Sequence, residues 1–583
     1  MAQDDPHSYS APSKAKVTHL NLDLQVDFEN QQLSGLALWD IDVTEGREII
    51  FDVKDMQIRS VRSGDEFLPF QLGPSDELLG QALRVWLPQG AKKVEIAYVT
   101  RAEASALQWL APVQTAGKKH PFLFTQSQAI LARSWIPCQD TPGVRFTYNA
   151  WVTVPKDLLA LMSAENPTQK NSKGVYSFQM PQAIPSYLMA LAVGDLEFQS
   201  LGEVTGIYAE PSMLKASAYE FAETEKMVGV AEGLYGSYRW GRYDMLVLPP
   251  SFPFGGMENP RLTFLTPTVI AGDRSLTSLI AHELAHSWSG NLVTNANWND
   301  FWLNEGFTVY LERRIMEDLY GKSYATMLSQ LGFGDLKHTL EETDSKDTHL
   351  KLDLKDRDPD EGLSDIAYEK GYFFLTHLES KVGRKKFDRF LRSYFDDNAF
   401  GTTTTAAFLS RVNRELGADL DVDAWVFSPG LPSDFRAPSS ERFKKVDFQR
   451  LAFLAGASPE SLRTKDWSTH EWLRFLRLLP ADLSIGQMTA LDRAFAFSDS
   501  GNSEILAQWL ATAIHVGYEP AYPALENFLT TVGRRKFLTP LYKGLVKTPE
   551  GLRRARSIYA KARPNYHSVA VGTIDEVVKW DER

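Results

Sequence analysis

The sequence predicts a multidomain α+β protein, in which a β-rich N-terminal region precedes two regions dominated by helices. Three observations support this fold class. The chain has 583 residues, more than the roughly 300 at which a single hydrophobic core stops growing. Apolar and polar residues alternate in the first third, as in half-buried strands. From about residue 195 onward the apolar period becomes helical.

The first predicted domain, residues 1–194, contains a series of short strands. Apolar residues occupy every second position of residues 19–28, and the runs 39–43 and 94–98 repeat the pattern. Short alternating runs with turn residues between them are typical of antiparallel sheets rather than of βαβ units. We therefore expect an N-terminal antiparallel β domain that packs against the rest of the protein and frames a substrate cleft.

The second predicted domain contains two helices that matter for function. Residues 276–289 lack glycine and proline, follow a plausible capping residue at Asp273 and stop at Gly290. A second helix is predicted to begin after Asp300 and to run through Arg313. Both helices lie in the region that carries the chemical motifs described below.

A proline- and serine-rich stretch, residues 428–440, is predicted to link this domain, residues 195–427, to a third domain, residues 441–583. In the third domain, the segment 468–471 (Ser-Thr-His-Glu) has the form of a helix capping box, and apolar residues follow it on one helical face. Short amphipathic helices in series predict a C-terminal α-helical domain that resembles a small solenoid.

Composition and charge exclude several classes of protein. The net charge of −12 at pH 7 leaves no basic surplus to neutralise phosphates, so we expect no nucleic-acid partner. No run of about 18 apolar residues occurs, so we expect no membrane-spanning segment. The single cysteine, Cys138, cannot form an internal disulfide, and residues 1–16 lack the apolar core of a signal peptide. We therefore expect a cytoplasmic protein, and we expect it to be monomeric.

The clearest chemical signal is His282-Glu283-Leu284-Ala285-His286. Positions i and i+4 of a helix share one face, so both imidazoles can reach one ion. Glu305, in Asn304-Glu305-Gly306, is far enough along the chain for one loop to separate it from the motif, and it provides a carboxylate ligand. With three protein ligands, the fourth position on zinc is open for water. Glu283 is offset from the ligand face and can act as general base toward that water. The pattern predicts one zinc ion, held by His282, His286 and Glu305.

Two other interpretations of the motif are weaker. An H-E-x-x-H sequence also arises by chance, but the helical context and the Asn-Glu-Gly segment at that distance favour catalysis. A purely structural zinc site usually closes with cysteines, and this chain has only one. Glu312 shares the helical face of Glu305. It therefore either contacts a zinc ligand and fixes its orientation without binding the metal, or is only a polar helix position.

A glycine-rich segment before the zinc motif indicates the kind of peptidase. In Gly255-Gly256-Met257-Glu258-Asn259-Pro260, the paired glycines let a backbone edge approach a bound peptide closely. The carboxylate of Glu258 beside them can hold a free α-ammonium group, which closes the cleft at the first residue of the substrate. Taken alone, the same segment is also compatible with an ordinary glycine turn.

The order of Gly-Gly-Met-Glu-Asn, His-Glu-x-x-His and Asn-Glu-Gly resembles the gluzincin zinc aminopeptidases, and within them the leukotriene A-4 hydrolases and their microbial aminopeptidase relatives. The resemblance covers nearly the whole chain and includes the segments 105–110, 136–142, 290–294, 301–306 and 428–432. It implies an N-terminal β saddle, a thermolysin-like catalytic domain and a helical C-terminal domain.

The resemblance also implies roles for residues outside the zinc motif. Gln128 would join Glu258 at the amine of the substrate, and the Tyr368 hydroxyl would stabilise the tetrahedral oxyanion opposite zinc. Arg534 and Lys536 would hold the C-terminal carboxylate of a short peptide. Without the resemblance, Tyr368 would be interpreted as an aromatic core residue and the basic pair as a solvated face.

This chain departs from the hydrolase pattern at the far end of the pocket. Asp360, which faces that end in the hydrolases, is present, but Leu363 and Phe254 stand where those enzymes have tyrosines. Both changes make the pocket wall less polar. A non-enzymatic binding protein of this fold would be expected to lack Glu283, a zinc ligand or Tyr368, and all are present. We therefore expect a zinc aminopeptidase that releases N-terminal residues from di- and tripeptides, with weak epoxide hydrolysis at the same zinc as the alternative.

Overall fold

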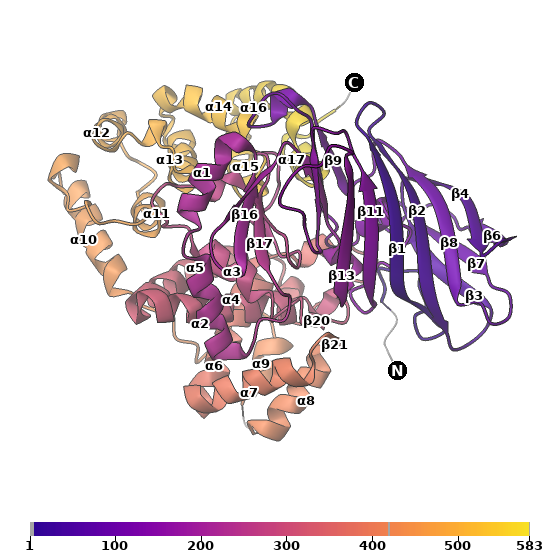
Figure 1. The fold of residues 1–583 in the computed structure, drawn as a ribbon. Coiled ribbons are helices and arrows are strands. Elements are labelled where there is room, and N and C mark those ends of the chain that lie inside the picture. Colours follow the sequence, from indigo (N-terminus) through magenta and orange to yellow (C-terminus); the bar gives the residue numbers. More distant parts are fainter. Residues whose placement is uncertain (1–4, 418–419, 582–583) are drawn as a thin grey trace.

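The computed structural model describes residues 5–417 and 420–581. It contains an N-terminal β domain, a catalytic domain of mixed helices and sheets, and a C-terminal helical domain, as the sequence predicts. In Figure 1 the strands of the β domain lie on the right, and the orange and yellow helices of the C-terminal domain lie at the upper left. Buried apolar residues form one core that extends through the first two domains and a second core in the C-terminal domain.

The largest sheet of the β domain has seven strands, in the order β13 (Val175–Pro185), β11 (Arg145–Thr153), β1 (Ala15–Asp27), β2 (Gln32–Val43), β8 (Lys93–Thr100), β4 (Met56–Ser63) and β5 (Glu66–Phe67). Its neighbouring strands are antiparallel, as expected, except for β1 and β11, which are parallel. Val94, Ile96 and Tyr98 of β8 are buried while the residues between them are not. This alternation confirms the predicted strand pattern.

Two smaller sheets complete the β domain. One contains β12 (Leu159–Met162), β14 (Leu191–Gly194), β10 (Phe122–Thr125) and β9 (Leu107–Leu110), and the other contains β3 (Glu48–Val53), β7 (Gln81–Trp86) and β6 (Phe70–Leu72). Every residue of the first of these sheets is buried. The chain leaves its strand β10 and leads directly to Gln128, so this rigid sheet positions a residue of the functional site.

The catalytic domain contains a five-stranded sheet, in the order β15 (Glu197–Ser200), β16 (Thr205–Ala209), β17 (Tyr243–Val247), β19 (Thr263–Leu265) and β18 (Gly256–Met257). Strand β18 is at the edge and pairs with β19 alone, in antiparallel register. The glycine-rich segment is therefore an edge strand and not an isolated turn. An edge strand has backbone groups free on one side, as a peptide-binding backbone requires.

The first zinc-motif helix, α3 (Ser278–Ala285), is shorter than the predicted 276–289. The Asp273 carboxylate accepts a hydrogen bond from the Ser275 amide (2.9 Å) and so caps the turn before the helix. After Ala285 irregular turns continue, and the Ser289 amide still donates to the Ala285 carbonyl (3.2 Å). Gly290 then ends this segment with φ of +94°, a conformation that favours glycine.

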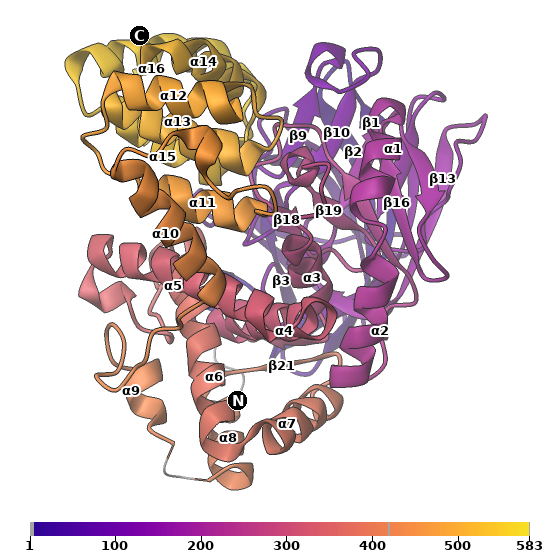
Figure 2. The same cartoon turned by 90° about the vertical axis from the view of Figure 1, so that its left-hand side faces the viewer.

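The second helix, α4 (Trp302–Tyr320), is longer than predicted and forms the centre of the catalytic domain. It packs against α3, α5 (Lys322–Glu342) and α6 (Gly371–Val382), and Figure 2 shows it running below α3. The other elements of this domain are α1 (Pro211–Glu220), α2 (Thr224–Tyr235), α7 (Arg384–Asp397), α8 (Thr405–Glu415), α9 (Val422–Val426), β20 (Val293–Asn295) and β21 (Gly401–Thr403).

Residues 428–440 form no helix or strand. The C-terminal domain follows as α10 (Glu441–Leu454), α11 (Thr469–Arg477), α12 (Ile485–Phe495), α13 (Ser503–Val516), α14 (Tyr522–Thr531), α15 (Arg535–Leu545), α16 (Pro549–Ala562) and α17 (Ser568–Val578). Helices α11, α13, α15 and α17 pack in one row, and α14 packs against α16. The predicted capping box is present, because the Glu471 carboxylate accepts a hydrogen bond from the Ser468 amide (2.9 Å).

Gly306 of α4 touches the backbone of Gly371, the first residue of α6. A Cβ atom at Gly306 would lie 2.7 Å from the Gly371 Cα. Gly306→Ala should therefore push α4 and α6 apart and destabilise the protein by about 1–3 kcal/mol. Gly233→Ala in α2, where no atom lies within 4 Å of the added Cβ, should instead stabilise the helix by about 0.5–1 kcal/mol. Thermal unfolding gives the midpoint of each variant. Equal midpoints would contradict the close contact of α4 with α6 at Gly306.

Candidate zinc centre and substrate cavity

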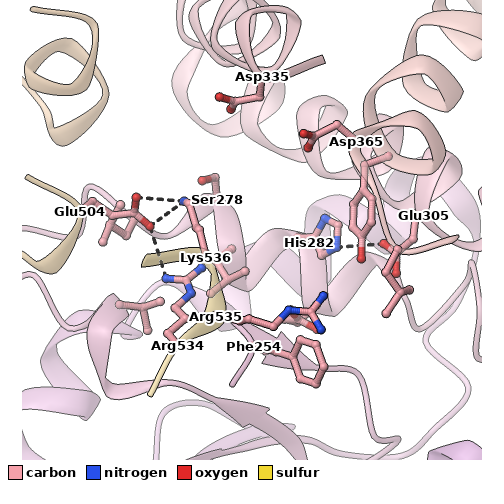
Figure 3. Close-up of a pocket in the computed structure, with 18 of the residues that line it drawn as sticks. Phe254, Ser278, His282, Glu305, Asp335, Asp365, Glu504, Arg534, Arg535 and Lys536 are labelled. Carbon is pink, nitrogen blue, oxygen red and sulfur yellow. Dashed lines mark hydrogen bonds and ion pairs between the residues drawn. The ribbon is translucent and has the colours of Figure 1, made fainter. Parts of the chain in front are cut away.

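The structure brings the three predicted zinc ligands together. His282 Nε2 lies 3.3 Å and His286 Nε2 lies 3.6 Å from the same carboxylate oxygen, Oε2 of Glu305. The three donor atoms lie within 4.8 Å of one another. A tetrahedral zinc ion with bonds of about 2.0–2.2 Å separates its ligand atoms by about 3.3–3.6 Å. Figure 3 shows His282 on α3 facing Glu305 on α4.

The other nitrogen of each imidazole is occupied. His282 Nδ1 lies 3.2 Å from Glu312 Oε2, and His286 Nδ1 lies 2.9 Å from Asn304 Oδ1. These contacts turn both Nε2 atoms toward Glu305, whose Oε2 is buried and accepts no hydrogen bond within the described residues. Partners at the imidazole nitrogen that does not bind the metal fix the tautomer and the orientation of the ring. The donor set and its orientation fit a zinc ion.

Glu283 projects from α3 on the side facing the edge strand β18. A Cβ atom at Gly256 would lie 2.2 Å from Glu283 Oε1, so only glycine leaves room for this carboxyl group. Glu283 is 4 % exposed, and its Oε2 has no hydrogen-bond partner among the described residues. Burial raises the pKa of Glu283 well above its usual range, and the charges of Glu258 and Glu305 add to this effect while His282 opposes it.

Glu258 and Gln128 line the same cavity as the zinc ligands. Glu258 follows β18 and is 4 % exposed, and its Oε1 lies 4.0 Å from His286 Nδ1. Within the described residues, neither Glu258 Oε1 nor Gln128 Nε2 has a hydrogen-bond partner. Burial raises the pKa of Glu258, while the charge of His286 opposes this. A cation at Glu258 would compensate a buried carboxylate. Met257, between Gly256 and Glu258, is buried and does not line the cavity.

Tyr368 lines the cavity beside the zinc ligands. It lies on a π-helical turn (Ile366–Lys370), and its ring is nearly parallel to that of His282, with centroids 6.0 Å apart. Burial raises the pKa of Tyr368 well above 10, and the charge of Glu305 adds to this. The phenol is therefore protonated and able to donate a hydrogen bond. π-Helical turns occur frequently at functional sites.

The cavity continues toward the C-terminal domain, where Arg534 and Lys536 line it. Its volume is about 820 Å³. Both cations contact Glu504 of α13, with Arg534 Nη1 at 3.3 Å and Lys536 Nζ at 2.8 Å. Although burial works against it, Lys536 and Arg534 lower the pKa of Glu504 to about 2. Glu504 is a site residue that the sequence did not reveal, because no motif marks it and only the packing of α13 against α15 brings it here.

The structure does not place every predicted residue in the cavity. Asp360 is not among the described residues that line it, whereas Leu363 and Phe254 are. Burial and the charge of Asp358 raise the pKa of Asp360 to about 7, while Arg535 opposes them. At positions 363 and 254 the cavity is therefore lined by apolar side chains.

Comparison with known proteins defines the class. Residues 11–188 match the peptidase M1 N-terminal domain, residues 219–426 the peptidase family M1 domain, and residues 467–578 the leukotriene A4 hydrolase C-terminal domain. The protein is thus a zinc metallo-aminopeptidase with a single catalytic zinc ion. None of the helices among the described residues is long and apolar enough to cross a bilayer.

The chain belongs to peptidase family M1, as a relative of leukotriene A4 hydrolase. It is 39 % identical to leukotriene A-4 hydrolase of Xenopus laevis over 97 % of both chains. It is 35 % identical to leucine aminopeptidase 2 of Ajellomyces capsulatus, over 98 % of this chain and 96 % of the relative. A solved structure of yeast leukotriene A4 hydrolase with bestatin superposes with a TM-score of 0.91, at 32 % identity over 99 % of this chain and 98 % of the other. The resemblance stated from the motifs is confirmed.

The contact between Glu312 and His282 predicts a role for Glu312 in zinc binding. Glu312→Gln should weaken zinc binding by about 10- to 100-fold, the range found when an outer partner of a metal ligand is lost. The control is Glu317→Gln, on the same helix, where Glu317 contacts Arg384 outside the cavity. Zinc affinity is measured by competition with a chromogenic chelator. Equal affinities of the two variants would show that Glu312 is only a polar helix position.

Proposed function

We propose that this enzyme releases N-terminal residues from di- and tripeptides, with its zinc ion held by His282, His286 and Glu305. The observation that carries the proposal is the buried Glu258 carboxyl group, which follows the edge strand β18 and whose Oε1 has no hydrogen-bond partner among the described residues. It is suited to the free α-ammonium group of a peptide, and it closes the cavity one residue before the bond to be cut. Gln128 supports this end from the neighbouring loop.

The chain's own residues supply the proton transfers. Zinc, when bound, acts as a Lewis acid and lowers the pKa of a bound water molecule. Glu283 then takes up the proton of the attacking water and delivers it to the leaving amine. Its burial supports this role, because a carboxylate with a raised pKa is a stronger base and a better carrier of the proton. The protonated Tyr368 hydroxyl donates a hydrogen bond to the developing oxyanion.

A short peptide would extend from Glu258 to a basic pair that lines the same cavity. Arg534 and Lys536 lie at the end facing the C-terminal domain, and Lys536 is 51 % exposed at its side chain. Although Glu504 pairs with both, the trio keeps one net positive charge for a substrate carboxylate. The yeast relative was solved with bestatin, and the fungal relatives are leucine aminopeptidases. Both support an aminopeptidase of this kind.

Epoxide hydrolysis is the second proposal and the weaker one. The curated relative from Xenopus laevis is a leukotriene A-4 hydrolase. In this chain, however, Asp360 does not line the cavity and the lining residue Leu363 has no hydroxyl group. We therefore propose that any epoxide hydrolysis is slow beside peptide hydrolysis. The cytoplasmic location, supported by the single buried cysteine, Cys138, and the monomeric state both stay predictions.

The role of Glu258 predicts a strict requirement for a free amine. An N-acetylated tripeptide should be hydrolysed at least about 100-fold more slowly than its free form, because acetylation leaves a buried carboxylate without its cation. Glu258→Gln should slow the free peptide and shrink this difference, whereas Glu77→Gln, at an exposed position of the β domain, should leave it unchanged. Rates come from chromatographic detection of the released amino acid. Rapid internal cleavage of the acetylated peptide would instead indicate a zinc endopeptidase.

A further inference from the structure

The cavity wall formed by the catalytic domain carries an acidic pair that the proposed mechanism does not use. Asp335 on α5 and Asp365, just before the π-helical turn, both line the cavity, and Figure 3 shows both carboxylates directed into it. Asp335 pairs with Arg477 (2.8 Å). Asp365 accepts a hydrogen bond from the Thr339 hydroxyl (2.6 Å) but forms no ion pair with any residue of 5–417 or 420–581. This wall has one negative charge in excess.

The opposite wall, which belongs to the C-terminal domain, has an excess of positive charge. Glu504 is shared by Arg534 and Lys536, and Arg535 and Lys543 line the same wall, so this wall has an excess of positive charge. In Figure 3 Glu504, Arg534 and Lys536 lie on the far side of the cavity from the acidic pair. The part of the cavity beyond the zinc centre is therefore negative on one side and positive on the other.

The two walls are close enough to influence each other. Burial raises the pKa of Asp365, the Thr339 hydrogen bond lowers it, and the charge of Asp335 raises it again, while Lys536 and Arg477 act to lower it. A substrate residue that reaches Lys536 is therefore also within reach of the field of Asp365. A cation placed between Asp335 and Asp365 would relieve their mutual repulsion.

We propose that Asp365, assisted by Asp335, makes the enzyme prefer short peptides that end in lysine or arginine. The proposal rests on the proposed aminopeptidase function and adds a substrate class to it. The terminal carboxylate contacts Lys536, and the side-chain cation of the same residue contacts Asp365. Leu331 and Leu473 also line the cavity and provide apolar surface for the methylene groups of a long basic side chain.

Arg535 is a second cation that would favour a different last residue of the substrate. Arg535 also lines the cavity, with its guanidinium carbon 5.9 Å from the Phe254 ring centroid. It forms no ion pair with an acidic residue in the part of the chain that the structure describes. If Arg535 dominated recognition of the last residue, peptides ending in glutamate would be favoured instead.

The test compares Leu-Gly-Lys with Leu-Gly-norleucine, whose last side chain has similar length but no charge, and with Leu-Gly-Glu. For the unmodified enzyme, kcat/KM should be about tenfold higher for the lysine peptide than for the norleucine peptide, as for one charge-assisted hydrogen bond. Asp365→Asn should abolish this preference without slowing hydrolysis of the norleucine peptide. The asparagine side chain keeps an oxygen for the Thr339 hydroxyl, so the local fold should persist. Asp353→Asn, at an exposed position outside the cavity, is the matched control and should keep the full preference.

Two results would overturn the proposal: equal kcat/KM for the lysine and norleucine peptides, or a preference that survives in Asp365→Asn. Faster hydrolysis of the glutamate peptide would assign the selection to Arg535 and also overturn it. These outcomes are separate from failure of the proposed function, because the norleucine peptide reports aminopeptidase activity without any charge at the last side chain. If leucine is not released from that peptide, the aminopeptidase proposal itself fails.

Discussion

The buried negative charge of three carboxyl groups is the constraint around which this protein is organised. Glu258, Glu283 and Glu305 lie in one cavity, each 3–4 % exposed and each with an oxygen that has no hydrogen-bond partner among the described residues. An unpaired buried carboxylate costs several kcal/mol. In the proposed function, a zinc ion at Glu305 and a substrate ammonium group at Glu258 would supply the missing positive charge. Glu283 lines the same cavity, and burial raises its pKa, as the proposed proton transfer requires.

Glycine contacts hold these groups in place. Gly256 leaves room for Glu283, with Oε1 2.2 Å from the position of an added Cβ, and Gly290 leaves room for Asn304, with Oδ1 at 2.3 Å. Asn304 in turn contacts His286 Nδ1. At both points the side chain of one segment therefore lies directly against the glycine of another. Close packing against these glycines helps to position Glu283 and Asn304, in addition to the hydrogen bond between Asn304 and His286.

Sequence patterns predicted the local chemistry but not the tertiary contacts. The spacing of His282, His286 and Glu305 predicted a common ion because helical geometry fixes which side chains share a face. Strand alternation predicted the β domain, although the parallel pairing of β1 with β11 depends on a long connection that periodicity does not report. Glu504 could not be predicted, because its partners lie on another helix and no motif marks it. The boundaries of α3 were missed because capping hydrogen bonds decide where a helix begins.

We propose that Glu258, in the cavity beside the zinc ligands, restricts cleavage to the first peptide bond. Mass spectrometry of a free hexapeptide during hydrolysis by the zinc-loaded enzyme tests this most directly, since every product is identified by its mass. We expect a ladder of peptides shortened one residue at a time from the N-terminus, together with the single amino acids released. Early appearance of internal fragments, before the terminal residue is lost, would contradict it.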